Sequence, residues 1–212
     1  MKLYLSSYRI PTPKTLITLL EKKPEETTLA IIINAKDYRP EPERTNKLNK
    51  LMYDLNQLGF KNVHFISLLD YSREDLVAVL AKFDALYLAG GDSYALRYAM
   101  KKSGFDDSIE EYLGGGGVYI GESAGAFCAG ITLEKGEGFD EPIAVPEIYY
   151  DGLHLVNSVV VPHADNIDYI DNVNKMVAYF EDKNISTIVL NDDQAYVVNG
   201  DNFILETGGG KS

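Results

Sequence analysis

The feature that most limits what this chain can fold into is the alternation of short apolar runs with longer amphipathic segments. Several runs are almost continuous in Val, Ile, Leu and Ala, which is typical of parallel strands buried on both faces. Residues 43–58 and 167–180 instead repeat apolar side chains every three or four positions, and Ser72 opens a helix-capping pattern. We therefore predict strands at residues 2–6, 29–34, 62–66, 85–89, 118–121, 155–161 and 185–190, separated by helices.

This alternation predicts an α/β fold with three layers, in which helices cover both faces of an open, mostly parallel sheet. The end of the chain differs, because residues 195–199 and 202–206 flank a Gly-Asp turn and predict a C-terminal β-hairpin at one edge of the sheet. No internal repeat, long linker or charged block interrupts the pattern. We therefore expect residues 1–212 to form a single domain.

The net charge and the cysteine content limit which binding partners and which cellular compartment we expect for this protein. Acidic residues outnumber basic ones by 32 to 20, so the net charge is −12, which disfavours binding to nucleic acid. One cysteine allows no intrachain disulfide, and the first apolar run is too short for a secretory signal. No apolar run could span a bilayer. We expect a cytoplasmic protein, monomeric or homodimeric, with no membrane partner.

The most informative segment is VYIGESAGAFCAG at residues 118–130. An apolar strand runs into Gly121-Glu122-Ser123-Ala124-Gly125 and then into small residues suited to a closely packed helix. This is a G-x-S-x-G nucleophile elbow in a strand–turn–helix context, where a sharp turn lifts the serine hydroxyl and small neighbours avoid a clash. The alternative interpretation is a glycine-rich turn whose serine caps the helix. The context favours Ser123 as a nucleophile.

A serine nucleophile needs a base, and the chain has three histidines. His64 lies inside a predicted strand, and His154 lies at the start of another. His163 follows the carboxyl end of the strand predicted at residues 155–161, and ligands of open α/β sheets bind outside such ends. We therefore expect His163 to be the base, although a loop histidine that caps the next helix fits the same position.

A third residue should orient the imidazole. Asp192 and Asp193 follow the strand predicted at residues 185–190, and Asp192 is the preferred candidate. The resulting order Ser…His…Asp differs from the Ser…Asp…His order of α/β-hydrolases. The latter order would need Asp140 or Asp151, which lie in an irregular stretch, residues 136–152, long enough to form a lid.

The segment Gly90-Gly91-Asp92-Ser93 follows another predicted strand. Glycines there leave backbone N–H groups free to approach a ligand, so Gly91 or its neighbour Gly90 could supply one oxyanion donor and Ala124 the other. The same segment also fits a turn in which Asp92 or Ser93 caps the next helix, and both interpretations can hold together. Scattered histidines and the lone Cys128 disfavour a metal site, and no motif predicts a cofactor.

Together these residues resemble the S51 family of serine peptidases, which includes aspartyl dipeptidases and cyanophycinases. The segments that carry the resemblance are Gly90-Gly91-Asp92-Ser93, Tyr119-Ile120-Gly121-Glu122-Ser123-Ala124-Gly125-Ala126, Pro162-His163 and Asp192. The resemblance covers most of the chain and implies a fold similar to class I glutamine amidotransferases. It also implies a triad of Ser123, His163 and Asp192, an oxyanion hole near Gly91 and Ala124, and cleavage of short peptides after an N-terminal aspartate without metal or cofactor.

The chain departs from this family at two places. Asp192 stands where the resemblance to the aspartyl dipeptidases implies a glutamate. Because aspartate has the shorter side chain, Asp193 stays open as the acid of the triad. The resemblance also implies an arginine, in the helix after the histidine, that binds the substrate carboxylate, but residues 164–182 contain only Lys175 as a cation. A β-aspartyl isopeptidase, an esterase and a non-catalytic binding domain of the same fold therefore stay open as alternatives.

Overall fold

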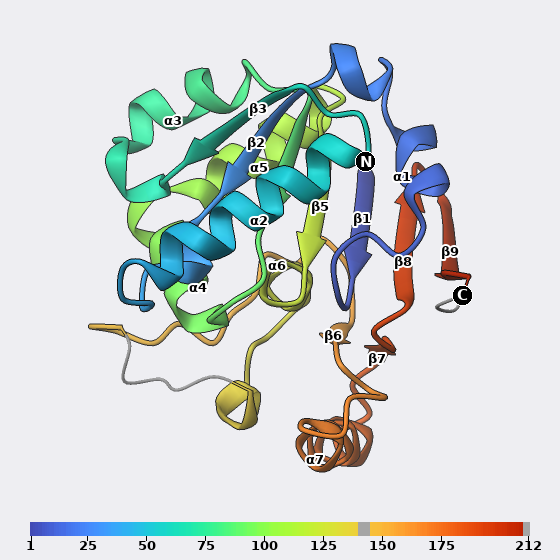
Figure 1. The fold of residues 1–212 in the computed structure, drawn as a ribbon. Coiled ribbons are helices and arrows are strands. Elements are labelled where there is room, and N and C mark those ends of the chain that lie inside the picture. Colours follow the sequence, from blue (N-terminus) through green and yellow to red (C-terminus); the bar gives the residue numbers. More distant parts are fainter. Residues whose placement is uncertain (140–144, 210–212) are drawn as a thin grey trace.

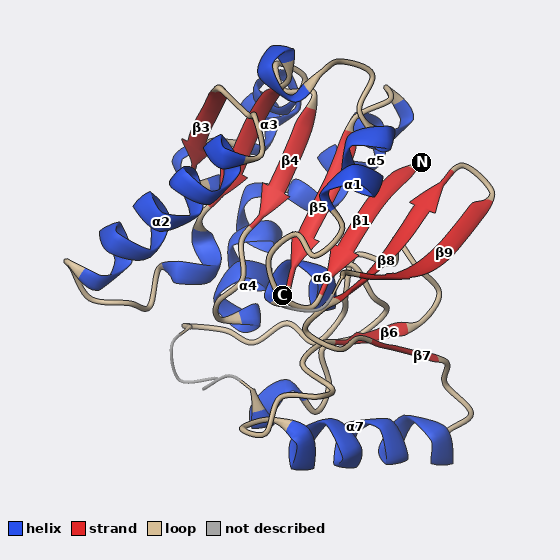
Figure 2. Cartoon of the chain, turned by 45° about the vertical axis from the view of Figure 1, so that its right-hand side comes forward, coloured by secondary structure: helices blue, strands red, loops and turns tan. Residues whose placement is uncertain are grey.

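The computed structural model describes residues 1–139 and 145–209. Within them, seven strands form one sheet in the order β3-β2-β4-β5-β1-β8-β9 (Figure 2). These strands are β1 (Lys2–Ser6), β2 (Thr28–Ile32), β3 (Asn62–Ile66), β4 (Ala85–Leu88), β5 (Val118–Glu122), β8 (Gln194–Asn199) and β9 (Asn202–Thr207). The first five pair only in parallel with one another, and β8 joins β1 antiparallel. The predicted α/β class is confirmed.

Alternate residues of the strands serve two separate cores, one on each face of the sheet. Leu86 and Leu88 of β4 belong to the core beneath α3, α4, α5 and α6, whereas Ala85 and Tyr87 belong to the core beneath α1 and α2. Figure 1 shows α2 in front of the strands and α5 behind them. The helices are α1 (Pro13–Leu19), α2 (Glu43–Gln57), α3 (Arg73–Leu80), α4 (Ser93–Ser103), α5 (Phe105–Gly114), α6 (Ala124–Cys128) and α7 (Ile170–Asp182).

Two of the predicted strands are shorter than expected and leave the main sheet. β6 (Val159–Val161) and β7 (Thr187–Val189) pair with each other in a small parallel sheet that carries α7 (Figure 2). The first part of the strand predicted at residues 155–161 is irregular, because the backbone N–H groups of His154 and Leu155 donate to carbonyls of Gly130 and Ala129 after α6. Tertiary contacts therefore override the apolar run at this place.

The predicted C-terminal hairpin and the predicted helix cap are both confirmed. β8 and β9 pair in antiparallel register at the edge of the sheet, and Gly200 in their turn has a φ of 63°, which favours glycine. The Ser72 hydroxyl accepts a hydrogen bond from the Asp75 N–H at 3.2 Å and so caps α3.

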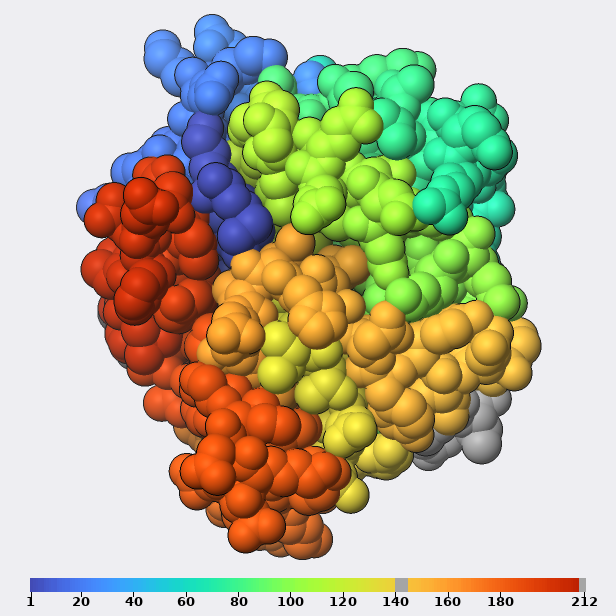
Figure 3. Space-filling view, turned by 180° about the vertical axis from the view of Figure 1, so that it is seen from behind, coloured from blue at the N-terminus to red at the C-terminus, as the bar shows by residue number. Residues whose placement is uncertain are grey.

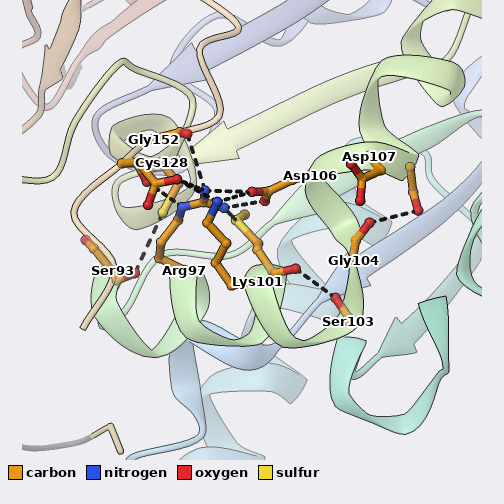
Figure 4. A network of polar contacts seen from close by, with 12 residues as sticks. Ser93, Arg97, Lys101, Ser103, Gly104, Asp106, Asp107, Cys128 and Gly152 are labelled. Atoms are coloured by element: carbon orange, nitrogen blue, oxygen red, sulfur yellow. Dashed lines mark hydrogen bonds and ion pairs between the residues drawn. The ribbon is translucent and has the colours of Figure 1, made fainter. Parts of the chain in front are cut away.

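A buried arginine anchors the segment that follows α6. The Arg97 side chain on α4 is fully buried, and its guanidinium forms a bidentate ion pair with Asp106 of α5 (Figure 4). Its Nε donates to the Asp151 carbonyl at 2.5 Å, and an Nη donates to the Asp151 carboxylate at 3.1 Å. Seen from behind, the segment that runs from residue 145 toward β6 lies between α4–α5 and α7 (Figure 3). Arg97 therefore connects the segment around Asp151 to α4 and α5.

We expect Arg97→Met to lower the free energy of unfolding by about 3 kcal/mol, because it leaves the partly buried Asp106 carboxylate without its bidentate partner. Burial alone would raise the pKa of Asp106, but hydrogen bonds from Arg97 and Lys101 hold it below its ordinary value of 3.8. The contribution is therefore present at neutral pH and is lost only as the pH falls below that value. Denaturant unfolding at pH 7 measures it.

The matched control for this prediction is Arg73→Met, which removes the exposed ion pair between Arg73 and Asp107. We expect that change to cost less than about 1 kcal/mol, because water screens the pair. Equal losses in the two variants would contradict the anchoring role of Arg97.

Candidate active site

Ser123 stands on a sharp turn between β5 and α6. Its φ of 50° and ψ of −104° are unusual for a residue with a side chain, as a nucleophile elbow requires. A Cβ on Gly121 would lie 2.6 Å from the Gly125 carbonyl oxygen, and a Cβ on Gly125 would overlap the Leu88 backbone. The expected need for small neighbours is therefore confirmed. The Ser123 side chain does not cap α6, so the capping interpretation is wrong.

The Ser123 hydroxyl instead meets His163. The distance between Ser123 Oγ and His163 Nε2 is 2.8 Å, and the distance between His163 Nδ1 and Asp192 Oδ1 is 2.6 Å. His163 follows β6 and has a φ of 64°, whereas Asp192 follows β7. The small second sheet thus brings its two loops against the end of β5. The structure places the three predicted residues in one hydrogen-bonded chain, which is the arrangement of a nucleophile, a base and an orienting acid.

Residues that the sequence analysis did not single out support this chain of hydrogen bonds. The Ser7 hydroxyl donates to Asp192 Oδ1 at 2.9 Å and accepts from the His163 backbone N–H at 2.7 Å. Asn166 Nδ2 donates to the other carboxylate oxygen of Asp192 at 3.2 Å, and the Tyr169 ring lies 5.1 Å from the His163 ring. Ser7 directly follows the carboxyl end of β1, so the rule that singled out His163 could also have found it.

The other candidate residues lie elsewhere. Of the acids, Asp192 contacts His163, and Asp193 forms no hydrogen bond to it within the described chain. Asp151 pairs with Arg97 and Lys101. Asp140 lies outside the described residues, as does part of the stretch 136–152 that was considered as a lid. His64 and His154 are exposed, and neither lines the cavity that holds Ser123.

The glycine loop after β4 lies beside Ser123, as predicted. Gly91 has a φ of 147°, and a Cβ there would overlap the Ala35 carbonyl oxygen, so this position requires glycine. Within the described residues, the backbone N–H groups of Gly91 and Ala124 have no hydrogen-bond partner, and both residues line the same cavity. Asp92 does not line it; the Asp92 carboxylate caps α4 by accepting from the Ala95 N–H at 2.7 Å.

The cavity around Ser123 has a volume of about 710 Å³, a usual size for a ligand site. Basic side chains from the loops after β1 and β2 and from α2 line one part of it: Arg9, Lys36, Arg39, Lys47 and Lys50. We call these residues the basic wall. Lys175, the one cation of residues 164–182, does not line this cavity and lies in a different hollow beside Asn172 and Tyr179.

At the carboxyl edge of this α/β sheet, a serine with strained backbone angles is hydrogen-bonded to a histidine, which is the arrangement that defines the class of serine hydrolases. Comparison with known proteins narrows the class. The model of peptidase family S51 matches residues 15–206, so the chain belongs to this family of serine peptidases and acts on peptides.

Relatives and solved structures agree with this assignment. An uncharacterized peptidase of Listeria innocua is 31% identical over 162 residues, which cover 74% of this chain and 75% of the relative. A crystal structure of a protein from Listeria monocytogenes, provisionally named peptidase E, is 25% identical with a TM-score of 0.81 and covers 98% of both chains. A peptidase from an acI-B1 actinobacterium shares the fold, with 18% identity, a TM-score of 0.70, and coverage of 97% of this chain and 87% of that one.

No helix within residues 1–139 and 145–209 combines the length and the apolar character needed to cross a bilayer.

Proposed function

We propose that this protein is a serine exopeptidase that cleaves dipeptides after an N-terminal aspartate, with Ser123, His163 and Asp192 as its catalytic triad. The observation that carries the proposal is the hydrogen-bonded chain from Ser123 Oγ through His163 to Asp192. Because Ser123 has strained backbone angles and does not cap a helix, a role in holding the fold together explains this arrangement poorly.

The proposed reaction has two halves. Ser123 Oγ attacks the peptide carbonyl while His163 Nε2 takes the hydroxyl proton, and the carbonyl oxygen becomes an oxyanion near the N–H groups of Gly91 and Ala124. His163 then gives the proton to the leaving nitrogen as the C–N bond breaks, which leaves an acyl-enzyme. Water adds to this ester by the same route and restores Ser123. Asp192 holds the imidazole and stabilises its charged form.

The basic wall supports an acidic substrate. Its cations gather in one part of the cavity of a chain whose net charge is −12. Arg9 and Lys50 share Asp54 as an ion-pair partner, at 3.0 and 3.6 Å, so one carboxylate faces two cations. A carboxylate on the acyl residue of the substrate would add the missing negative charge. These residues come from the loops after β1 and β2 and from α2, and not from the helix after His163, where the family resemblance implied an arginine.

We expect kcat/KM to be about 100-fold higher for Asp-Leu than for Asn-Leu, because the amide matches the shape of aspartate but lacks its charge. Rates of hydrolysis for a panel of Xaa-Leu dipeptides, with β-Asp-Arg and an acetate ester added, measure this ratio. Ser123→Ala serves as the control for contaminating activity. Equal cleavage of Asp-Leu and Asn-Leu would contradict aspartate specificity, and cleavage of β-Asp-Arg or the ester alone would favour the isopeptidase or esterase alternative.

We further propose a cytoplasmic location and a monomeric or homodimeric state. Cys128 is the one cysteine of the chain, so no intrachain disulfide can form, which suits a reducing compartment.

A further inference from the structure

Glu122, the residue before the nucleophile, is buried and lies at the wall of the cavity around Ser123. Its carboxylate accepts hydrogen bonds from the Tyr87 hydroxyl at 2.9 Å, from the Gly90 N–H at 3.2 Å and from the Arg9 N–H at 3.1 Å. Glu122 therefore joins the ends of three neighbouring strands of the sheet. One of the three joined segments is the glycine loop beside Ser123.

Lys36 binds the same glycine loop through the carbonyl oxygen of Gly90, whereas Glu122 binds its N–H group. It follows β2 in the short helical turn η2 (Asn34–Lys36), and its ammonium donates a hydrogen bond to the Gly90 carbonyl oxygen. Both backbone polar groups of Gly90 are thus held by oppositely charged side chains. β2, β4 and β5 are adjacent in the sheet, so Lys36, Gly90 and Glu122 meet at their carboxyl ends.

This clamp determines where the next N–H group points. In a trans peptide, the carbonyl of one residue and the N–H of the next point in opposite directions. Because Lys36 holds the Gly90 carbonyl, the Gly91 N–H is directed away from Lys36, and it has no partner among the described residues. The loop lies directly beside the nucleophile: a Cβ on Gly90 would lie 3.2 Å from Ser123 Cβ.

We propose that Lys36 and Glu122 are positioning residues that aim the Gly91 N–H at the oxyanion formed when Ser123 attacks. This inference rests on the proposed function, because it assigns a role within the same reaction. Lys36 also polarises the Gly90–Gly91 peptide, so the Gly91 N–H becomes a stronger donor as negative charge develops on the substrate oxygen. In this step both residues act through the Gly90–Gly91 peptide, and neither touches the reacting atoms.

Lys36 is half-buried at the wall of the cavity, so its charge is partly removed from water. Burial lowers the pKa of Lys36 below its ordinary value of 10.5, the Glu122 carboxylate opposes that shift, and the nearby cations Arg39 and Lys47 add to it. A lysine used only for solubility would lie in water, where its charge costs nothing. Deprotonation of Lys36 would remove the charge from the Gly90 carbonyl, so the reactivity of Ser123 should fall as the pH rises toward this pKa.

Diisopropyl fluorophosphate tests the inference without a peptide. Ser123 Oγ displaces fluoride from phosphorus, and the phosphoryl oxygen occupies the place of the oxyanion. Mass spectrometry would follow the rate of labelling at Ser123 in the wild type and in Lys36→Met, Lys36→Arg and Glu122→Gln. We expect Lys36→Met and Glu122→Gln to react about 10- to 100-fold more slowly, a smaller loss than removal of an oxyanion donor itself. Lys36→Arg, which keeps a charged donor, should recover most of the rate.

The pH profile separates this role from a merely structural one. As the pH rises toward 10.5, the ordinary pKa of lysine, the wild-type labelling rate should decline, whereas Lys36→Arg should not show that decline, because arginine stays charged. Lys61→Met is the matched control, because Lys61 also donates to a backbone carbonyl, that of Asn56 at 3.3 Å, far from the site. It should label at the wild-type rate.

The outcomes distinguish this inference from the proposed function. Equal labelling rates in the wild type, Lys36→Met and Glu122→Gln would overturn the positioning role and leave the triad intact. Absence of Ser123 labelling in the wild type would overturn the proposed function instead. If Lys36→Met does not fold, which circular dichroism would show, the pH profile of Lys36→Arg still decides the question.

Discussion

Replacing Ser123 with alanine is expected to lower kcat for Asp-Leu by about 10⁶-fold, close to the loss seen when a triad nucleophile is removed. The hydroxyl is the atom that forms the acyl-enzyme, and no other group of the triad can replace it. The fold should persist, because alanine keeps the Cβ and loses one hydrogen bond, worth about 1 kcal/mol. Single-turnover and steady-state rates at high enzyme concentration measure the residual activity.

The control for this experiment is Ser72→Ala. It also removes a serine hydroxyl, but from the cap of α3, away from the cavity around Ser123. We expect that variant to lose about 1 kcal/mol of stability and to keep its activity. Activity retained in Ser123→Ala at more than about one thousandth of the wild-type rate would contradict the nucleophile assignment, since a triad without its serine loses far more.

The second large effect is expected for Asp192→Asn, which should lower kcat by about 10⁴-fold. The Asp192 carboxylate accepts a hydrogen bond from His163 Nδ1, so that Nε2 is free to accept the proton of Ser123. An asparagine amide can present its NH₂ group to Nδ1, which would favour the tautomer whose Nε2 already carries a proton. The imidazole would then keep its position and lose its function as a base.

Asp193→Asn provides the matched control for Asp192→Asn. It makes the same chemical change one residue later, and within the described chain the Asp193 side chain forms no hydrogen bond to His163. We expect it to keep kcat within about threefold of the wild type, as is usual for a change away from the reacting groups. If Asp193→Asn reduced kcat strongly and Asp192→Asn did not, the acid of the triad would be misassigned.

The sheet and the elbow could be predicted because their signals are local. Strands buried on both faces must be apolar at nearly every position, and the turn at Ser123 needs glycine two residues before and after it. The rule that ligands bind beyond the carboxyl ends of strands then singled out His163 and the pair Asp192 and Asp193 from sequence position alone. Asp192 reaches His163 although its side chain is shorter than the glutamate that the family resemblance implied.

The remaining features depended on how separate segments meet. Residues 155–158 resemble a strand, but they form no ladder because the neighbouring backbone bonds to the turn after α6. Lys175 was the nearest cation to His163 in sequence, yet it faces another hollow, whereas the basic wall comes from the first 50 residues. The direction of Glu122 could not be predicted, because it depends on donors from β4 and from the loop after β1.

The sequence by itself determined the fold class, the position of the strained serine and the choice of histidine, because apolar periodicity and glycine placement act over a few residues. Only the tertiary structure decided which aspartate meets His163, that Ser7 supports both, and that Lys36 and Glu122 hold Gly90 between them. These contacts join residues from 29 to 185 positions apart along the chain. Their geometry is set by the order of strands in the sheet, and no local pattern of residues encodes that order.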